Sequence, residues 1–186
     1  MNLFPDLGLG LLHGWIYFVF YLIVFIITMS TCSSEVRKRL YDRSLWDKRT
    51  KIITAVGKLF SIANIIMILF GALKIGNIEF VIGTIVYLIG LSLLVISIIN
   101  YRNAPLDKPI TNGFYKISRN PQMVSLYVLF TGMILVVGSW INLVFLGVTI
   151  TCAHFSVLGE ESALTEQYGE SYLEYKKQVA RYFIFF

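Results

Sequence analysis

Charge is scarce in this sequence, and that scarcity decides the class of protein. Charged residues make up 15% of the 186 positions, hydrophobic residues make up 56%, and the mean hydropathy is +0.71. So few charges cannot cover the surface of a soluble globular domain, and the composition therefore indicates a membrane protein. The length allows about four to six membrane spans with short connections, which predicts one compact bundle without a separate soluble domain.

Other features are missing as well, and each absence excludes a class of site. The two cysteines, Cys32 and Cys152, form no CxxC or Cys/His spacing, so we expect neither a disulfide framework nor a metal site. The sequence contains no G-x-G-x-x-G run, which disfavours a dinucleotide site. No Lys or Arg precedes Arg37, so the N-terminus lacks the basic region of a cleavable signal peptide and is expected to stay in the mature protein. We expect no nucleic-acid partner.

Long apolar runs are what the sequence does contain. Runs of about 20 residues, the length that crosses a bilayer as a helix, predict five transmembrane helices. Their expected ranges are Leu9–Thr31, Ile52–Leu73, Ile78–Ile99, Pro121–Val137 and Ile141–Leu158. The expected fold is an all-α, polytopic membrane helical bundle with the lipid bilayer as its surroundings. Lys58 and Asn64 stand out as polar residues inside a span, and the sequence assigns them no role.

The basic residues collect in alternate loops. Seven lie between the first two spans, four between the third and fourth, and three in the tail, whereas the opposite face has only Lys74. The positive-inside rule then predicts that the N-terminus is outside and the C-terminus is cytoplasmic. For all of these cations except Arg119 we favour a topological role or attraction to anionic lipid over a role in a site.

The tail carries apolar and aromatic residues at helical spacing. The stripe consists of Leu164, Tyr168, Tyr172, Tyr175, Val179 and Tyr182. Such a stripe predicts an amphipathic C-terminal helix that lies along the interface or caps the bundle, with an interruption at Gly169. Packing is the more common role of such tyrosines.

A short connection brings two polar clusters together. The fourth and fifth spans are joined by only a few residues, so we expect an antiparallel pair in which the start of one meets the end of the other. Arg119, Asn120 and Pro121 would then lie beside Glu160 and Glu161. Simpler interpretations stay open, since Asn-Pro is a common helix start and charged residues often mark the bilayer edge.

Two motifs carry a resemblance to a known family. The run GFYKISRNPQM resembles the G-x-Y-x-x-x-R-(H/N)-P-x-Y signature of isoprenylcysteine carboxyl methyltransferases and phospholipid N-methyltransferases, and the tail EESALTEQYGESYLEYKKQVAR resembles the continuation of that signature. Asn120 replaces the histidine of many relatives, and Met123 stands where tyrosine is usual. The resemblance covers roughly residues 100–186, the expected catalytic and cofactor-binding region, whereas residues 1–99 hold the first three helices and the basic loop.

The resemblance implies an enzyme that uses S-adenosylmethionine at the cytoplasmic helix ends, with a lipophilic or lipid-modified acceptor entering from the bilayer. The implied cofactor-binding residues are Gly113, Tyr115, Arg119, Pro121, His154, Glu160, Glu161, Tyr168 and Tyr172. The implied catalytic residues are Arg119, Asn120 and Glu161. An amide is no proton acceptor near neutral pH, so Asn120 cannot act as a base in place of histidine.

Several acceptors and two other function classes stay open. An isoprenylcysteine-like carboxylate is the favoured acceptor, and a phospholipid amine or a small thiol are the alternatives for the same site. A nicotinamide-dependent membrane reductase and a non-catalytic membrane scaffold are the alternatives of another class.

Overall fold

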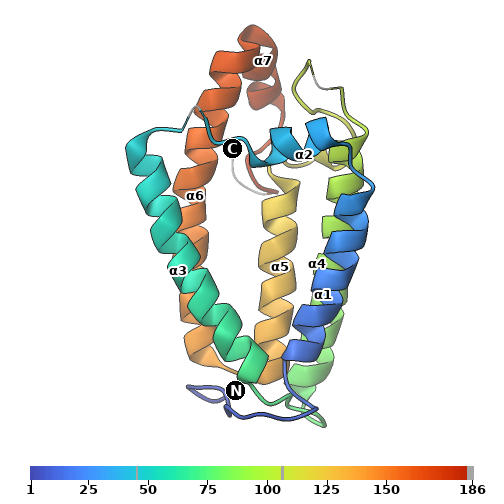
Figure 1. Ribbon diagram of the computed structural model, residues 1–186, viewed down its shortest axis with the longest axis vertical. Helices are drawn as coiled ribbons and strands as arrows, with labels where there is room; N and C mark the ends of the chain where they lie inside the picture. The colour runs from blue at the N-terminus through green and yellow to red at the C-terminus, as the bar shows by residue number, and fades with distance from the viewer. Residues whose placement is uncertain (45, 106, 184–186) are drawn as a thin grey trace.

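The computed structural model describes residues 1–44, 46–105 and 107–183, and these residues form helices without strands. The elements are α1 (Trp15–Ser30), α2 (Ser34–Tyr41), α3 (Lys48–Phe70), α4 (Ile78–Arg102), the 3-10 turn η1 (Gly113–Lys116), α5 (Pro121–Val137), α6 (Trp140–Tyr168) and α7 (Glu170–Gln178). Five apolar helices run up and down as a bundle, and α2 and α7 gather at one of its ends (Figure 1). The predicted all-α fold is confirmed.

The membrane character of the bundle is confirmed as well. In the described ranges, α3, α4 and α6 are long and apolar enough to cross a bilayer, with 23, 25 and 29 residues, and α1 and α5 are shorter apolar helices. The predicted start of the first span was wrong, because α1 begins at Trp15 and not at Leu9. The preceding glycine-rich segment instead runs across the ends of other helices, where the Gly8 amide donates to the Phe70 carbonyl at 2.9 Å. This segment lies at the end of the bundle opposite α2 and α7 (Figure 1).

Helix α6 is longer than predicted. It continues without a break past Leu158 to Tyr168, and 29 residues correspond to roughly 43 Å of helix, which exceeds a hydrocarbon core of about 30 Å. Its last turns therefore extend beyond the length needed to cross the bilayer. The predicted interruption at Gly169 is confirmed, since this residue adopts φ 56° and ψ −131° between α6 and α7.

Close helix contacts and one buried polar pair hold the bundle together. A Cβ atom on Gly132 would lie 2.3 Å from the backbone nitrogen of Tyr87, so α5 approaches α4 at a distance that only glycine allows. On the other side, Asn142 of α6 donates from Nδ2 to Oδ1 of Asn64 in α3 at 2.6 Å. Asn64 thus links two helices, whereas Lys58 is exposed on α3.

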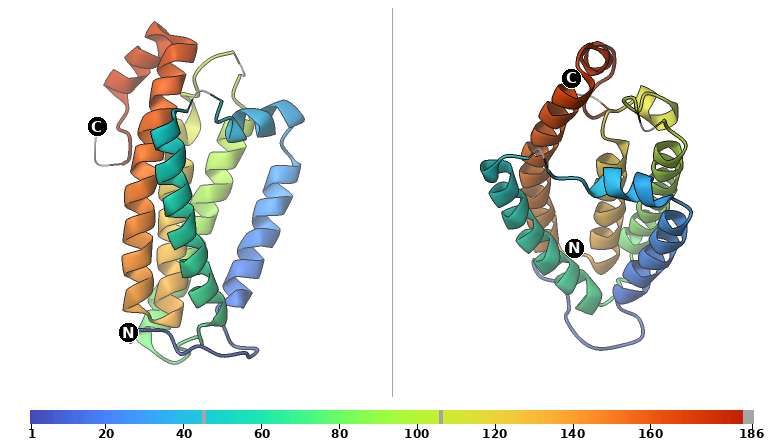
Figure 2. Two further views of the ribbon diagram at one scale, coloured as in Figure 1. Left: turned by 60° about the vertical axis from the view of Figure 1, so that its left-hand side comes forward. Right: turned by 45° about the horizontal axis from the view of Figure 1, so that its top comes forward.

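The antiparallel pair of α5 and α6 is more open than the sequence suggested. The two helices are joined at Gly138 and Ser139, but α5 packs mainly along α4 and α6 mainly along α3, and they contact each other much less (Figure 2). The fully buried aliphatic residues and methionine of α5 lie in its second half, toward the connection, whereas the first half buries Pro121 and Ser125. At the other end the two helices leave room for a cavity.

Candidate active site

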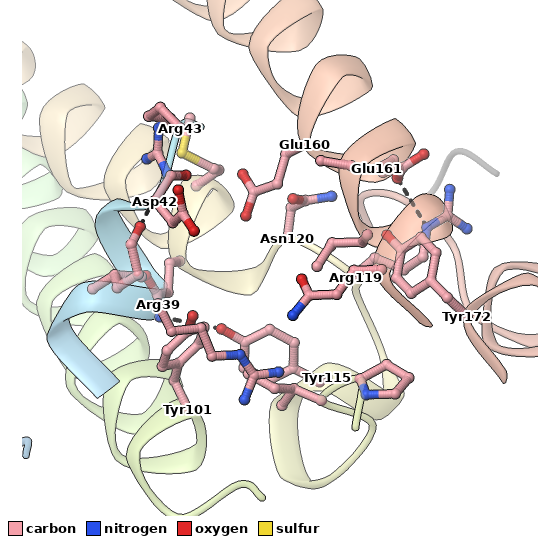
Figure 3. A pocket seen from close by; sticks show the side chains of 18 of the residues that line it. Arg39, Asp42, Arg43, Tyr101, Tyr115, Arg119, Asn120, Glu160, Glu161 and Tyr172 are labelled. Carbon is pink, nitrogen blue, oxygen red and sulfur yellow. Dashed lines mark hydrogen bonds and ion pairs between the residues drawn. The ribbon is translucent and has the colours of Figure 1, made fainter. Parts of the chain in front are cut away.

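A cavity of about 380 Å³ lies at the end of the bundle that carries α2 and α7. Its walls come from α2 and the turn after it, the end of α4, η1, the start of α5, the end of α6, and α7 (Figure 3). Of the site residues predicted from sequence, it is lined by Tyr115, Arg119, Asn120, Glu160, Glu161 and Tyr172. Segments that are far apart in the sequence therefore share one site.

The two predicted polar clusters meet at Arg119 and Glu161. Arg119 Nε donates to Glu161 Oε1 at 3.0 Å, and the two side chains are only 3% and 4% exposed. Two charges removed from water to this extent require each other, because an unpaired charge there would be strongly destabilising. The proximity expected from the sequence is confirmed.

Glu161 is engaged by more than one cation. Its carboxylate accepts from Arg181 Nε at 3.1 Å and from Arg181 Nη2 at 3.0 Å, and Lys176 Nζ lies 3.9 Å away. The hydrogen bond to Glu161 raises the pKa of the Arg181 guanidinium, which therefore stays charged. Both carboxylate oxygens of Glu161 are thus already occupied by protein donors.

The same cluster fastens the tail to the start of α5. Arg119 donates from its backbone amide to the Ala180 carbonyl at 2.9 Å, and from Nη1 to the carbonyls of Lys176, at 3.1 Å, and Val179. The Tyr175 hydroxyl donates to the Tyr115 carbonyl at 2.7 Å. The tail thereby forms one wall of the cavity.

Glu160 has a different environment from its neighbour. Among the described residues it takes part in no hydrogen bond and no ion pair, although it is largely covered and lines the cavity. Figure 3 shows it directed toward the wall that carries Asp42 and Arg43, on the opposite side from Glu161. Consecutive helical residues are about 100° apart around the axis, so two adjacent acids can face two surroundings. One of them is paired and the other is not.

Asn120 and Pro121 begin α5 in the expected place, but Asn120 does not cap it in the expected way. Its side chain makes no capping bond and instead donates from Nδ2 to the Arg181 carbonyl at 3.3 Å. The Ser118 hydroxyl accepts from the Asn120 backbone amide at 3.1 Å. Pro121 occupies the first turn of the helix, as predicted, and does not line the cavity.

The tyrosines of the cavity are neutral hydrogen-bonding groups. Tyr115 is buried, and its hydroxyl accepts from Gln122 Nε2 at 3.1 Å. Burial raises the pKa of the Tyr115 and Tyr172 phenols above the ordinary value, so neither ionises near neutral pH. Gly113 does not line the cavity, but its φ of 60° allows the sharp entry into η1 that places Tyr115.

Besides Gly113 and Pro121, two more predicted residues do not line the cavity. His154 lies deeper on α6, where Nδ1 is 3.2 Å from the Tyr182 hydroxyl. Tyr168, at the end of α6, lies beneath the guanidinium of Arg39, whose Cζ is 5.9 Å from the ring centre. Neither residue is among those that line the cavity.

The wall formed by α2 and the following turn was missed in the sequence, where its cations were assigned to topology. Arg39 donates to the carbonyls of Pro105 at 2.7 Å and Lys108 at 2.9 Å, and it also lies over the Tyr101 ring. Val36 and Trp46, in the same basic segment, are both buried. Such apolar residues among seven cations were the available sign that this loop packs on the protein.

The fold and the site define a polytopic membrane protein with a small cavity of mixed charge between its helix ends and their connecting segments. The sequence model of the phospholipid methyltransferase family matches residues 53–171, and the chain therefore belongs to this family of membrane methyltransferases. The match includes the start of α5 and both glutamates, and it ends before most of α7 and begins after α2. No curated protein and no solved structure matches the chain.

Proposed function

We propose that this protein transfers a methyl group from S-adenosylmethionine to the amine of a phospholipid, in the cavity beside Glu160. The family supplies the reaction class, and the unpaired carboxylate of Glu160 is the observation that supports a cationic donor and an amine acceptor. The cavity volume of about 380 Å³ is within the range of small-molecule sites.

The residues of the cavity fit such a donor. S-adenosylmethionine, when bound, would supply an electrophilic methyl carbon on a sulfonium. The amine nitrogen would bond to this carbon as the carbon–sulfur bond breaks, and the bonding electron pair would stay on the sulfur of the departing thioether. Glu160 would stabilise the cationic part of the donor, because a covered carboxylate without a partner gains most from a nearby positive charge. Tyr115 and Tyr172 offer neutral aromatic surfaces to the same space.

A phospholipid amine is protonated near neutral pH, so it must lose one proton before its nitrogen lone pair can attack the methyl carbon. Asn120 cannot take this proton, whereas the free carboxylate of Glu160 can accept it. The remaining rate enhancement would come from alignment of the two reactants in a space shielded from water, which is worth up to about 7 to 11 kcal/mol in well-oriented cases.

We assign Arg119 and Glu161 to positioning within this proposal. Their charged atoms are used by each other, by Arg181 and by tail carbonyls, so their main contribution is to hold the cavity walls together. This division leaves Glu160 as the acid that touches ligand. The excess of basic residues at this end of the bundle supports a cytoplasmic orientation of the site.

An isoprenylcysteine-like carboxylate is the second candidate acceptor. The cations of the α2 wall favour it, because Arg39 and Arg43 have no carboxylate partner among the described residues. A carboxylate acceptor would need no proton removal. The nicotinamide-dependent reductase and the non-catalytic scaffold have no comparable support, since the family that matches is one of methyltransferases.

Transfer of labelled methyl from S-adenosylmethionine in proteoliposomes tests the proposal. We expect label in phosphatidylethanolamine and little in a farnesylcysteine analogue, with loss of transfer in Glu160→Gln. Glu166→Gln is the matched control, because Glu166 is exposed on the same helix and does not line the cavity. Label in farnesylcysteine alone would support the second acceptor, and label in neither, with no binding of S-adenosylhomocysteine, would refute the proposed reaction.

A further inference from the structure

Arg43 presents a free edge of its guanidinium. Its Nη1 donates to the carbonyls of Leu40 at 3.2 Å and Asp42 at 2.7 Å, and its Cζ lies 4.5 Å from the centre of the Trp46 ring. Its Nε and Nη2 donate to no acceptor among the described residues. Two parallel N–H groups on one edge are the arrangement with which arginine binds a carboxylate or phosphate through two hydrogen bonds.

Arg43 forms no ion pair within the described ranges, although Glu160, which lines the same cavity, attracts it electrostatically over a longer distance. In the described part of the chain, no carboxylate oxygen lies within 4.0 Å of its nitrogens. The nearest acid in sequence, Asp42, accepts from the backbone amide of Ser44 at 2.9 Å, and the hydrogen bonds from Ser44 lower the pKa of this carboxyl. Asp42 is therefore occupied in holding the turn that positions Arg43.

The face of the Arg43 guanidinium that packs on Trp46 is held in place by the protein. Trp46 is buried, so the ring beneath the guanidinium is anchored in the protein. Arg39, one turn earlier on α2, holds the helix to the α4–α5 connection through the carbonyls of Pro105 and Lys108. An exposed arginine that is held at both its stem and its ring-facing side loses less entropy when it binds an anion.

We propose that the α2 wall, with Arg43 at its centre, is an anion subsite that binds a carboxylate or phosphate of a ligand whose cationic centre lies at Glu160. Both residues line the same cavity, and neither has an ion-pair partner among the described residues. Glu160 and Arg43 therefore present a carboxylate and a guanidinium, neither of them held in an ion pair by a residue that the structure describes, to the same cavity, and this arrangement is complementary to a zwitterion. The wall lies outside the residues matched by the family, so the proposal rests on the contacts of this wall and not on the family match.

Both reactants of the proposed methyl transfer have an anionic group next to a cationic one. Which of these groups binds Arg43 rests on the proposed function. The methyl donor has a carboxylate next to its ammonium, and a phospholipid amine has a phosphate next to its amine. The subsite itself is defined by the anionic oxygen group that they share.

Inorganic phosphate tests the subsite without donor or acceptor. In a Trp15→Phe, Trp140→Phe background, Trp46 is the remaining tryptophan, and we expect a saturable change of its fluorescence on titration with phosphate at constant ionic strength. The change should be lost in Arg43→Gln and weakened in Arg43→Lys, which keeps the charge but not the fork. Arg49→Gln is the matched control, because Arg49 is exposed in the same basic segment and does not line the cavity.

Two further measurements identify the source of the anion. If the donor supplies it, Arg43→Gln weakens binding of S-adenosylhomocysteine roughly tenfold and leaves its decarboxylated analogue unchanged. If the acceptor supplies it, Arg43→Gln raises the KM for phosphatidylethanolamine by a similar factor and leaves donor binding unchanged. A phosphate response that is absent, or equal in Arg43→Gln and the parent, would overturn the subsite. A normal phosphate response in a protein that transfers no methyl group would overturn the proposed function alone.

Discussion

Replacing Glu160 or Glu161 by glutamine should have different consequences, although the two residues are adjacent on α6. One variant should lose stability, and the other should lose donor binding without losing stability. Glu161→Gln removes the charge that pairs with Arg119 and Arg181, and we expect it to destabilise the fold. Glu160→Gln removes a charge that has no partner among the described residues, and we expect it to leave stability unchanged or to raise it. The second variant should nevertheless lose donor binding.

The magnitudes follow from the two environments. Removal of one partner from a buried ion pair costs about 3 to 5 kcal/mol. Arg119 is 3% exposed, but Arg181 is 21% exposed and can be hydrated, and glutamine keeps one acceptor oxygen. We therefore expect the low end, about 3 kcal/mol, for Glu161→Gln. For Glu160→Gln we expect about 0 to 1 kcal/mol of stabilisation, because a neutral amide is less costly to cover than a carboxylate.

The assay is the free energy of unfolding in mixed micelles, followed by far-ultraviolet circular dichroism as sodium dodecyl sulfate is increased. Binding of S-adenosylhomocysteine is measured by calorimetry on the same preparations, with Glu166→Gln as the control for loss of an acid from α6. An equal loss of stability in both variants would refute the reasoning, since it would mean that Glu160 has a stabilising partner. Retained donor binding in a stable Glu160→Gln variant would refute its assignment to the ligand.

Three other predictions address the bundle and its orientation. Gly132→Ala should lower the free energy of unfolding by about 1 to 3 kcal/mol, because its Cβ would lie 2.3 Å from the Tyr87 backbone. Gly147→Ala, which has open space around it, should stabilise α6 by up to about 1 kcal/mol. Equal effects of the two substitutions in thermal unfolding would contradict this reasoning. Asn142→Ala should cost about 1 to 2 kcal/mol through loss of the bond to Asn64, and an unchanged unfolding free energy would show that the pair contributes nothing. A single cysteine at the exposed position Ser171, in a cysteine-free background, should react with a membrane-impermeant maleimide only from the cytoplasmic side, and labelling from outside would reverse the proposed orientation.

The sequence was informative about apolar segments and about one contact. Hydropathy located all five apolar helices, and the short connection at Gly138 was enough to predict that Arg119 meets Glu161. Hydropathy could not locate the start of α1, because the leucines before Trp15 are as apolar as those after it. The difference is made by close packing, because a Cβ atom on Gly14 would lie 2.2 Å from the Ile68 carbonyl oxygen at the end of α3.

The different surroundings of Glu160 and Glu161 could not be read from the sequence. Their separation depends on the rotation of α6 about its axis, and that rotation is set by packing against α3, including the Asn64–Asn142 bond. The α2 wall was hidden for another reason. Its seven-cation segment satisfies the positive-inside rule whether or not it packs on the protein, so charge counting alone cannot reveal that Arg43 faces a cavity.

The arrangement of paired and unpaired charges connects the fold with the proposed chemistry. Since α5 and α6 follow different neighbours away from their connection, their far ends separate, and the contacts of Arg119 with Glu161 and the tail span that separation. Those charges are paired within the protein, so they stabilise the walls in the absence of ligand. Glu160 is largely covered and forms no ion pair among the described residues, whereas Arg43 is exposed, so a ligand that supplies a cation would offset the desolvation of Glu160. A ligand that binds only the folded protein must stabilise it by RT ln(1 + [L]/Kd), and in this cavity the affinity would come from the two charges that form no ion pair within the described ranges.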